Sequence, residues 1–81
     1  MPSKVPEIVM DKYNPVQEFY MIEKLNQFYS LWKNKDFKKS DEIRDFILSH
    51  GIKITYYDDY IFYVGLVLNG EGYRTITGII S

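Results

Sequence analysis

The chain has 81 residues, of which 46% are hydrophobic and 26% charged, with a formal net charge of −1 and no cysteine. A chain of this length forms one small domain that buries about 60–65% of its unfolded surface. The near-neutral charge argues against a broad basic surface for non-specific nucleic-acid binding, and the absence of cysteine excludes disulfides, thiolate nucleophiles and cysteine-based zinc sites.

The first 13 residues differ in composition from the rest of the chain. They contain two prolines and one short apolar run, Ile8-Val9-Met10. Proline is tolerated at the edge of a sheet, and chain ends are often loosely attached. Residues 1–13 are therefore predicted to form an arm or an edge strand, ahead of a single domain over residues 14–81.

A first helix is predicted from Asn14-Pro15 to about Asn34. Asn is a good N-cap, Pro suits the first helical position, and Gln17 completes a capping-box pattern. The apolar residues of this stretch recur at helical spacing. They are Phe19, Ile22, Leu25, Phe28, Tyr29 and Trp32.

The second predicted helix begins at Phe37 and ends before Gly51. Asp36 precedes it as N-cap, because its carboxylate can accept the free N–H groups of the first turn. The apolar positions recur at near-helical spacing and form one buried side. They are Phe37, Ile43, Ile47 and Leu48, with the small Ser40 between them. Gly51 suits the left-handed position after a helix, with Ile52 contacting Ile47.

After Gly51 the hydrophobic period changes from helical to alternating, which indicates strands. The predicted strands cover residues 52–57, 60–68 and 73–80, separated by Asp58-Asp59 and by Asn69-Gly70-Glu71-Gly72. The sequence leaves open whether the second loop has two residues, in which case Asn69 and Gly70 should have positive φ, or three residues ending at Gly72, and that choice sets the direction of Tyr73. The predicted fold class is α+β: a helical hairpin followed by a three-stranded antiparallel β-sheet (ααβββ).

The middle strand, YIFYVGLVL, is apolar at every position, which implies burial on both faces, whereas two helices can cover only one. With a two-residue turn at Asp58-Asp59, Ile54 shares a face with Ile61, Tyr63 and Val67. The other face is then expected to be covered by a second chain, self or foreign, or by the N-terminal arm. The protein-interface candidates are Tyr57, Tyr60, Phe62, Val64, Leu66, Leu68 and Tyr73.

A second candidate surface lies at the turn between the helices. Four basic residues fall within seven positions there: Lys33, Lys35, Lys38 and Lys39. Such side chains, with the free N–H groups of a helix start, can hold phosphates, although a solvated turn has the same composition. Arg44 is a further RNA-binding candidate, but an ion pair with Asp41 or Asp45 is the simpler interpretation.

Residues 28–60 resemble the C-terminal segment of cysteinyl-tRNA synthetases. That family has a Lys-Asp-aromatic opening, a small residue followed by Asp, an Ile-Arg-Asp triplet and a Gly-Ile before a strand. The matching residues are Lys35, Asp36, Phe37, Ser40, Asp41, Ile43, Arg44, Asp45, Gly51 and Ile52, with Ser40 in place of the usual alanine. The synthetase's nucleotide-binding signatures and zinc ligands have no counterpart here. The resemblance therefore implies a non-catalytic appended module that contacts tRNA or a translation component.

No catalytic or ligand-binding motif can be assembled from the remaining residues. His50 is the single histidine, and Asp58-Asp59 lacks the oxygen pattern of a calcium loop. Gly70-Glu71-Gly72 leads into a strand rather than a helix, unlike a dinucleotide fingerprint. We therefore expect no enzyme activity, no metal and no cofactor.

Two functional hypotheses follow. The first, implied by the resemblance, is contact with tRNA or another RNA through the helical hairpin. The second is a protein-interaction module, either a homo-oligomer or a phage- or viral-type inhibitor, that uses the apolar sheet face. The chain contains no alanine and is rich in Tyr, Ile, Lys, Asp and Asn, a composition typical of AT-rich coding, which includes many phages and viruses. Without a membrane-spanning run or signal-peptide pattern, we expect a cytoplasmic protein, in the host cytoplasm if it is viral.

Overall fold

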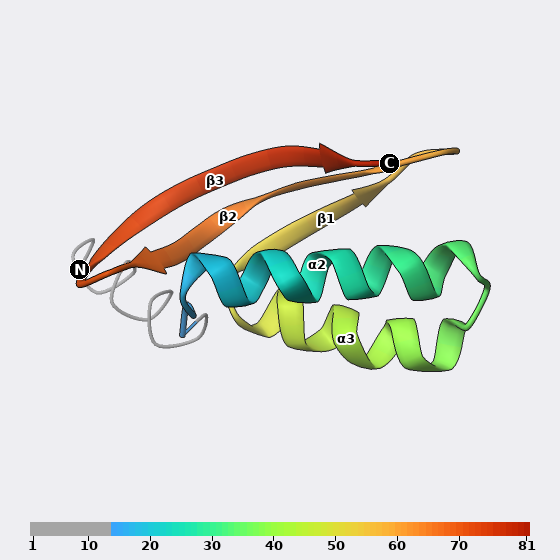
Figure 1. Cartoon of the computed structure of the whole chain (residues 1–81), viewed down its shortest axis with the longest axis horizontal. Helices are drawn as coiled ribbons and strands as arrows, with labels where there is room; N and C mark the ends of the chain where they lie inside the picture. The colour runs from blue at the N-terminus through green and yellow to red at the C-terminus, as the bar shows by residue number, and fades with distance from the viewer. Residues whose placement is uncertain (1–13) are drawn as a thin grey trace, which may run out of the picture.

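The computed structural model describes residues 14–81, which form two helices followed by three strands (Figure 1). The elements are α2 (Glu18–Lys33), α3 (Phe37–Ser49), β1 (Ile52–Tyr56), β2 (Ile61–Asn69) and β3 (Gly72–Ile80). The strands pair antiparallel in the order β1-β2-β3, and both helices lie on one side of the sheet. The predicted α+β class and ααβββ order are confirmed. The predicted arm, residues 1–13, lies outside the described residues.

The first helix begins later than predicted. It starts at Glu18 with Gln17 at the N-cap, while Asn14 has a positive φ of 47°. The carbonyl oxygen of Val16 accepts a hydrogen bond from the N–H of Leu68 at 2.8 Å, and Gln17 forms a parallel bridge with Leu68. Pairing with β2 therefore keeps residues 16–17 extended, and the predicted capping box at Asn14 and Gln17 is wrong.

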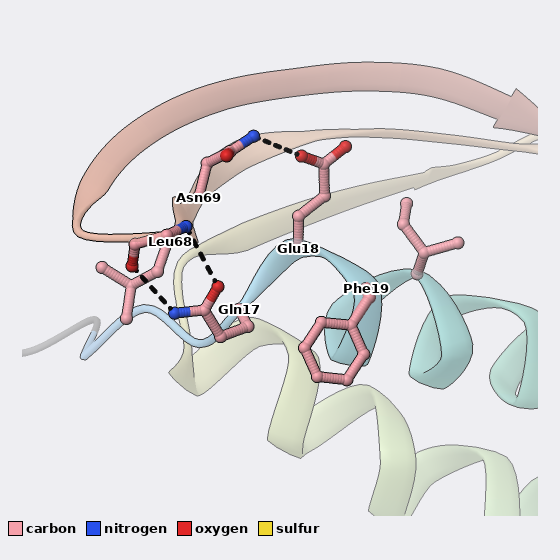
Figure 2. A pocket seen from close by; sticks show the side chains of 7 residues that line it. Gln17, Glu18, Phe19, Leu68 and Asn69 are labelled. Carbon is pink, nitrogen blue, oxygen red and sulfur yellow. Dashed lines mark hydrogen bonds between the residues drawn. The ribbon is translucent and has the colours of Figure 1, made fainter.

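Side chains at the start of α2 bind the β2–β3 hairpin (Figure 2). Gln17 Nε2 donates to the carbonyl oxygen of Gly70 at 3.1 Å, and Gln17 Oε1 accepts from the N–H of Gly70 at 3.3 Å. Glu18 Oε1 accepts from Asn69 Nδ2 at 3.2 Å and from Arg74 Nη1 at 3.3 Å. These tertiary bonds, rather than local capping, fix where α2 begins.

The second helix begins and ends where the sequence predicts. Asp36 is its N-cap, and the carboxylate accepts the backbone N–H of Lys39 at 3.5 Å. Gly51 follows the helix with a φ of 98°, which favours glycine, and its N–H donates to the carbonyl oxygen of Leu48 at 3.2 Å. The predicted glycine stop is therefore confirmed.

The core lies between the helices and one face of the sheet. Its buried side chains are Met21, Leu25, Phe28, Ile47, Ile52, Ile61, Val67 and Ile76. Three residues predicted on the apolar helix sides are instead exposed, namely Phe19 (75%), Phe37 (53%) and Leu48 (41%). Ser40 is buried, as is Ile47. On each helix, fewer apolar residues are buried than the apolar spacing predicts, because only those that contact the sheet or the other helix are covered.

Both β-hairpins turn the chain through two residues. The N–H of Tyr57 donates to the carbonyl oxygen of Tyr60 at 2.9 Å, so Asp58-Asp59 turns the chain as predicted. In the second loop Asn69 pairs with Gly72, which leaves Gly70-Glu71 as the connection. The predicted positive φ at Asn69 is therefore wrong, because Asn69 is the last residue of β2 rather than a loop residue. Gly70 has a φ of 67°, and a positive φ at the first loop residue is the pattern of a type II′ turn.

Candidate functional site

The outer face is defined here as the sheet surface turned away from α2 and α3. Side chains alternate between the two faces of a strand, so the register assigns each residue to one of them. The outer face comprises Lys53, Thr55, Phe62, Val64, Leu66, Leu68, Tyr73, Thr75, Thr77 and Ile79. The hydrogen bond between Tyr57 and Tyr60 continues the β1–β2 pairing by one step, and the alternation then adds these two residues to the same face. All seven interface candidates named from the sequence lie on it.

The centre of the outer face is a row of apolar side chains along β2: Phe62, Val64, Leu66 and Leu68. Across the strands Phe62 lies opposite Thr55 and Ile79, and Leu68 lies opposite Tyr73. These neighbours leave the row half-buried, and both helices lie on the other side of the sheet (Figure 1). Leu68, at one end of the row, also lines a hollow beside the start of α2. Ile79 is 61% exposed and Tyr73 58%. Of the outward positions on the three strands, only Lys53 carries a charge.

Two tyrosines extend this face at the β1–β2 turn. The rings of Tyr57 and Tyr60 stack with centroids 4.7 Å apart and an interplanar angle of 12°. The turn itself is held from the helix layer, because the hydroxyl of Tyr29 donates to the carbonyl oxygen of Asp59 at 2.9 Å. A tyrosine ring offers an apolar surface with a polar tip, which suits the rim of a protein interface.

The outer face continues into a hollow at the start of β1. This hollow has a volume of about 350 Å³ and is lined by Leu48, Gly51, Ile52, Lys53, Val64 and Gly65. Val64 belongs to the central row of the outer face, and the exposed Leu48 comes from the end of α3. The hollow therefore adds an apolar recess beside the outer face.

The predicted RNA-binding lysines surround the turn between α2 and α3. Lys33, Lys35, Lys38 and Lys39 are all exposed. A hollow of about 290 Å³ at this turn is lined by Trp32, Lys33, Lys35, Phe37 and Asp58. Cations and aromatic rings thus lie close together, with the carboxylate of Asp58 beside them.

Arg44 is already engaged by neighbouring side chains. Its guanidinium lies 3.4 Å from a carboxylate oxygen of Asp41 and 3.5 Å from one of Asp45. The hydroxyl of Tyr56 and the Asp41 carboxylate both raise the pKa of Arg44, and Tyr56 has the larger effect. The ion-pair interpretation of Arg44 made from the sequence is confirmed.

A further hollow lies between the start of α2 and the β2–β3 hairpin (Figure 2). It has a volume of about 460 Å³, and its apolar lining is Phe19, Ile22 and Leu68. Its polar side chains are already hydrogen-bonded to each other or to the hairpin. Gln17 bonds to the backbone of Gly70, and Glu18 accepts hydrogen bonds from Asn69 and Arg74. These groups are arranged to join two elements rather than to present an acid and a base to a substrate.

Within residues 14–81, no group of three or more His, Asp or Glu side chains is placed to hold a metal ion. His50 Nδ1 lies 2.6 Å from the carbonyl oxygen of Asn14 and so helps to hold the segment before α2. No helix in this part of the chain is long and apolar enough to cross a membrane.

No protein-family model, curated protein or solved structure matches this chain. The site therefore rests on the chain's own geometry. On β3, sequence reasoning missed three outer-face residues, Thr75, Thr77 and Ile79. The alternation of these residues with Arg74 and Ile76 was the available signal, but it could be used only once the loop length and register were known.

Proposed function

We propose that this protein is a non-catalytic protein-interaction module whose outer face binds another protein. The observation that carries the proposal is the apolar row Phe62, Val64, Leu66 and Leu68, with both helices on the other side of the sheet. Contiguous apolar patches of this kind, rimmed by polar groups, mark interaction sites in small proteins.

The composition of the outer face fits a protein partner better than a polar ligand. Aliphatic and aromatic residues occupy its central strand, whereas the polar residues Lys53, Thr55, Thr75 and Thr77 lie on the two flanking strands. An apolar centre with a polar rim is the usual anatomy of a protein interface. Binding would remove the central row from water, and a few well-packed anchors there would dominate the affinity.

Replacing Leu66 by Glu tests this function. The partner is first isolated with the full chain from the cells that express it, and binding of the purified pair is then measured by calorimetry. We expect Leu66→Glu to weaken binding by several kcal/mol, because it places an unpaired charge in a desolvated interface. Added salt should change the wild-type affinity little.

The matched control is Asn26→Glu, which adds the same charge at an exposed position of α2. It should retain wild-type affinity. Both variants are first compared with the wild type by thermal unfolding, to separate binding from folding. A partner that binds Leu66→Glu as tightly as the wild type would rule out the outer face as the interface.

A second candidate function is RNA contact through the turn between the helices, as the synthetase resemblance implies. The observation that favours it is the hollow that brings Trp32 and Phe37 beside Lys33 and Lys35. An aromatic ring can stack on an unpaired base while nearby cations hold the phosphates. The neighbouring Asp58 and the net charge of −1 weigh against tight binding.

Changing Lys33, Lys35, Lys38 and Lys39 to Gln tests the RNA hypothesis. We expect lower affinity for single-stranded RNA, and each lost phosphate contact should reduce the slope of log affinity against log salt by about 0.7. Fluorescence anisotropy over a salt series measures both quantities. Lys53→Gln, on the outer face, is the control and should leave the slope unchanged. RNA binding that does not depend on these four lysines would contradict the hypothesis.

A further inference from the structure

Among residues 14–81, β3 is a long sheet edge with no strand paired on its outer side, and it lacks the features that normally prevent strands from pairing with other chains. It runs for nine residues, contains no proline, and pairs with β2 one residue to one without a bulge. Its only charged residue, Arg74, is bonded to Glu18 at the start of α2. Figure 1 shows β3 as the outermost strand, with neither helix across its far edge. Natural edge strands of this length usually carry a charge, a proline or a bulge.

The backbone groups on the edge of β3 that no described residue pairs with follow from the hydrogen-bond pattern of the sheet. Tyr57 bonds to Tyr60, and the N–H of Leu66 donates to the carbonyl oxygen of Gly51 at 3.2 Å. Hydrogen-bonded and non-hydrogen-bonded pairs alternate along antiparallel strands. The backbone N–H and C=O groups of the even-numbered residues of β2 therefore point toward β1, and those of the odd-numbered residues point toward β3. The register then directs the even-numbered residues of β3 toward β2. The N–H and C=O groups that face away from the sheet belong to Tyr73, Thr75, Thr77 and Ile79.

These four residues are self-complementary in one antiparallel register. In this register Ile76 lies opposite Ile76 of a second copy, with a two-fold axis between them. Tyr73 then pairs with Ile79 of the second copy, and Thr75 pairs with its Thr77. Every outward N–H and C=O of the four residues then has a partner. Aromatic–aliphatic and Thr–Thr pairs are favourable across strands. Arg74 falls opposite Gly78 of the second copy, so no like charges meet.

The geometry points to β3 as a self-association edge, through which two copies of this chain join their sheets into one continuous sheet. The occupant of the edge is a second copy because the hydrogen-bonding groups, the side-chain pairs and the position of the single charge all match under two-fold symmetry. Each chain would keep its outer face on the same side of the joined sheet. The inference uses the edge of the sheet, whereas the proposed function uses its face.

The test is the mass of the full chain in solution, measured by sedimentation over a concentration series. We expect the wild type to reach twice 9.7 kDa as the concentration rises. Two double variants then test the register. Thr75→Lys with Thr77→Lys places like charges opposite each other across the axis, whereas Thr75→Lys with Thr77→Glu places opposite charges there. The first should weaken the dimer roughly tenfold, and the second should leave it as strong as the wild type or stronger.

Several outcomes overturn the proposal. A wild-type chain that stays monomeric at every concentration overturns it. A Lys/Glu variant that dissociates as readily as the Lys/Lys variant also overturns it, because equal dissociation would indicate a register in which Thr75 lies opposite Thr75 of the second copy. A dimer that Leu66→Glu dissociates but that both β3 variants leave intact would support the outer face and reject the edge. Thermal unfolding shows whether each variant is folded. Should both β3 variants unfold, disulfide formation between separately made Thr75→Cys and Thr77→Cys chains replaces them, and its absence overturns the register.

Discussion

Replacing Gly65 by Ala is expected to destabilise the protein by roughly 3 kcal/mol, the upper range for forcing extra atoms into a packed core. A Cβ atom at this position would lie 2.7 Å from the Cα of Ile52 and would overlap the carbonyl oxygen of Gly51. Both are backbone atoms, so no side-chain rotation can relieve the overlap. β1 would have to move away from β2 at the point where the chain leaves α3 and enters the sheet.

Gly72→Ala is the matched control for this prediction. Gly72 also lies in the sheet, but no atom lies within 4 Å of the Cβ that it would gain. This change should be neutral or stabilise by about 0.4–1 kcal/mol, because alanine reduces the freedom of the unfolded chain. The free energy of unfolding is measured by chemical denaturation. A chain of this length has a total stability of about 4–12 kcal/mol, so equal stabilities for the two variants would contradict the close approach at Gly65.

Phe28→Ala is expected to cost about 3–5 kcal/mol, the range for truncating a buried aromatic ring. Phe28 is 1% exposed and is the largest fully buried side chain among residues 14–81. Its ring contacts β1 through Tyr56, with centroids 6.1 Å apart. Removing it would leave a cavity between α2 and the sheet that the surrounding structure can only partly close.

Phe19→Ala removes the same ring from the same helix and serves as the control. Phe19 is 75% exposed, so its truncation should change the free energy of unfolding by no more than about 0.5 kcal/mol. Denaturant unfolding of the two variants compares them directly. Comparable losses at the two positions would mean that α2 faces the sheet through a different side.

Local sequence signals predicted the elements whose ends are set by their own residues. The N-cap at Asp36, the left-handed Gly51 and the turn at Asp58-Asp59 all lie where the sequence indicates. Each depends on a conformational preference or a hydrogen bond within a few residues along the chain. For the same reason the order of the elements, and hence the fold class, could be predicted.

Features that depend on contacts between distant residues could not be predicted in this way. The start of α2 was placed too early because the carbonyl of Val16 bonds to Leu68, far away in sequence. The outward direction of Phe19 and the close approach at Gly65 likewise depend on how α2 and β1 pack against the sheet.

For the candidate site, too, some features follow from the local sequence and others only from the tertiary structure. The alternation along β2 by itself determined that Phe62, Val64, Leu66 and Leu68 share a face, because successive side chains in a strand point in opposite directions. Only the tertiary structure decided that both helices lie on the opposite face, and that the Gly70-Glu71 loop sets Tyr73 against Leu68. A one-residue change in that loop would have turned every side chain of β3 to the other face, and the local sequence fits both loop lengths.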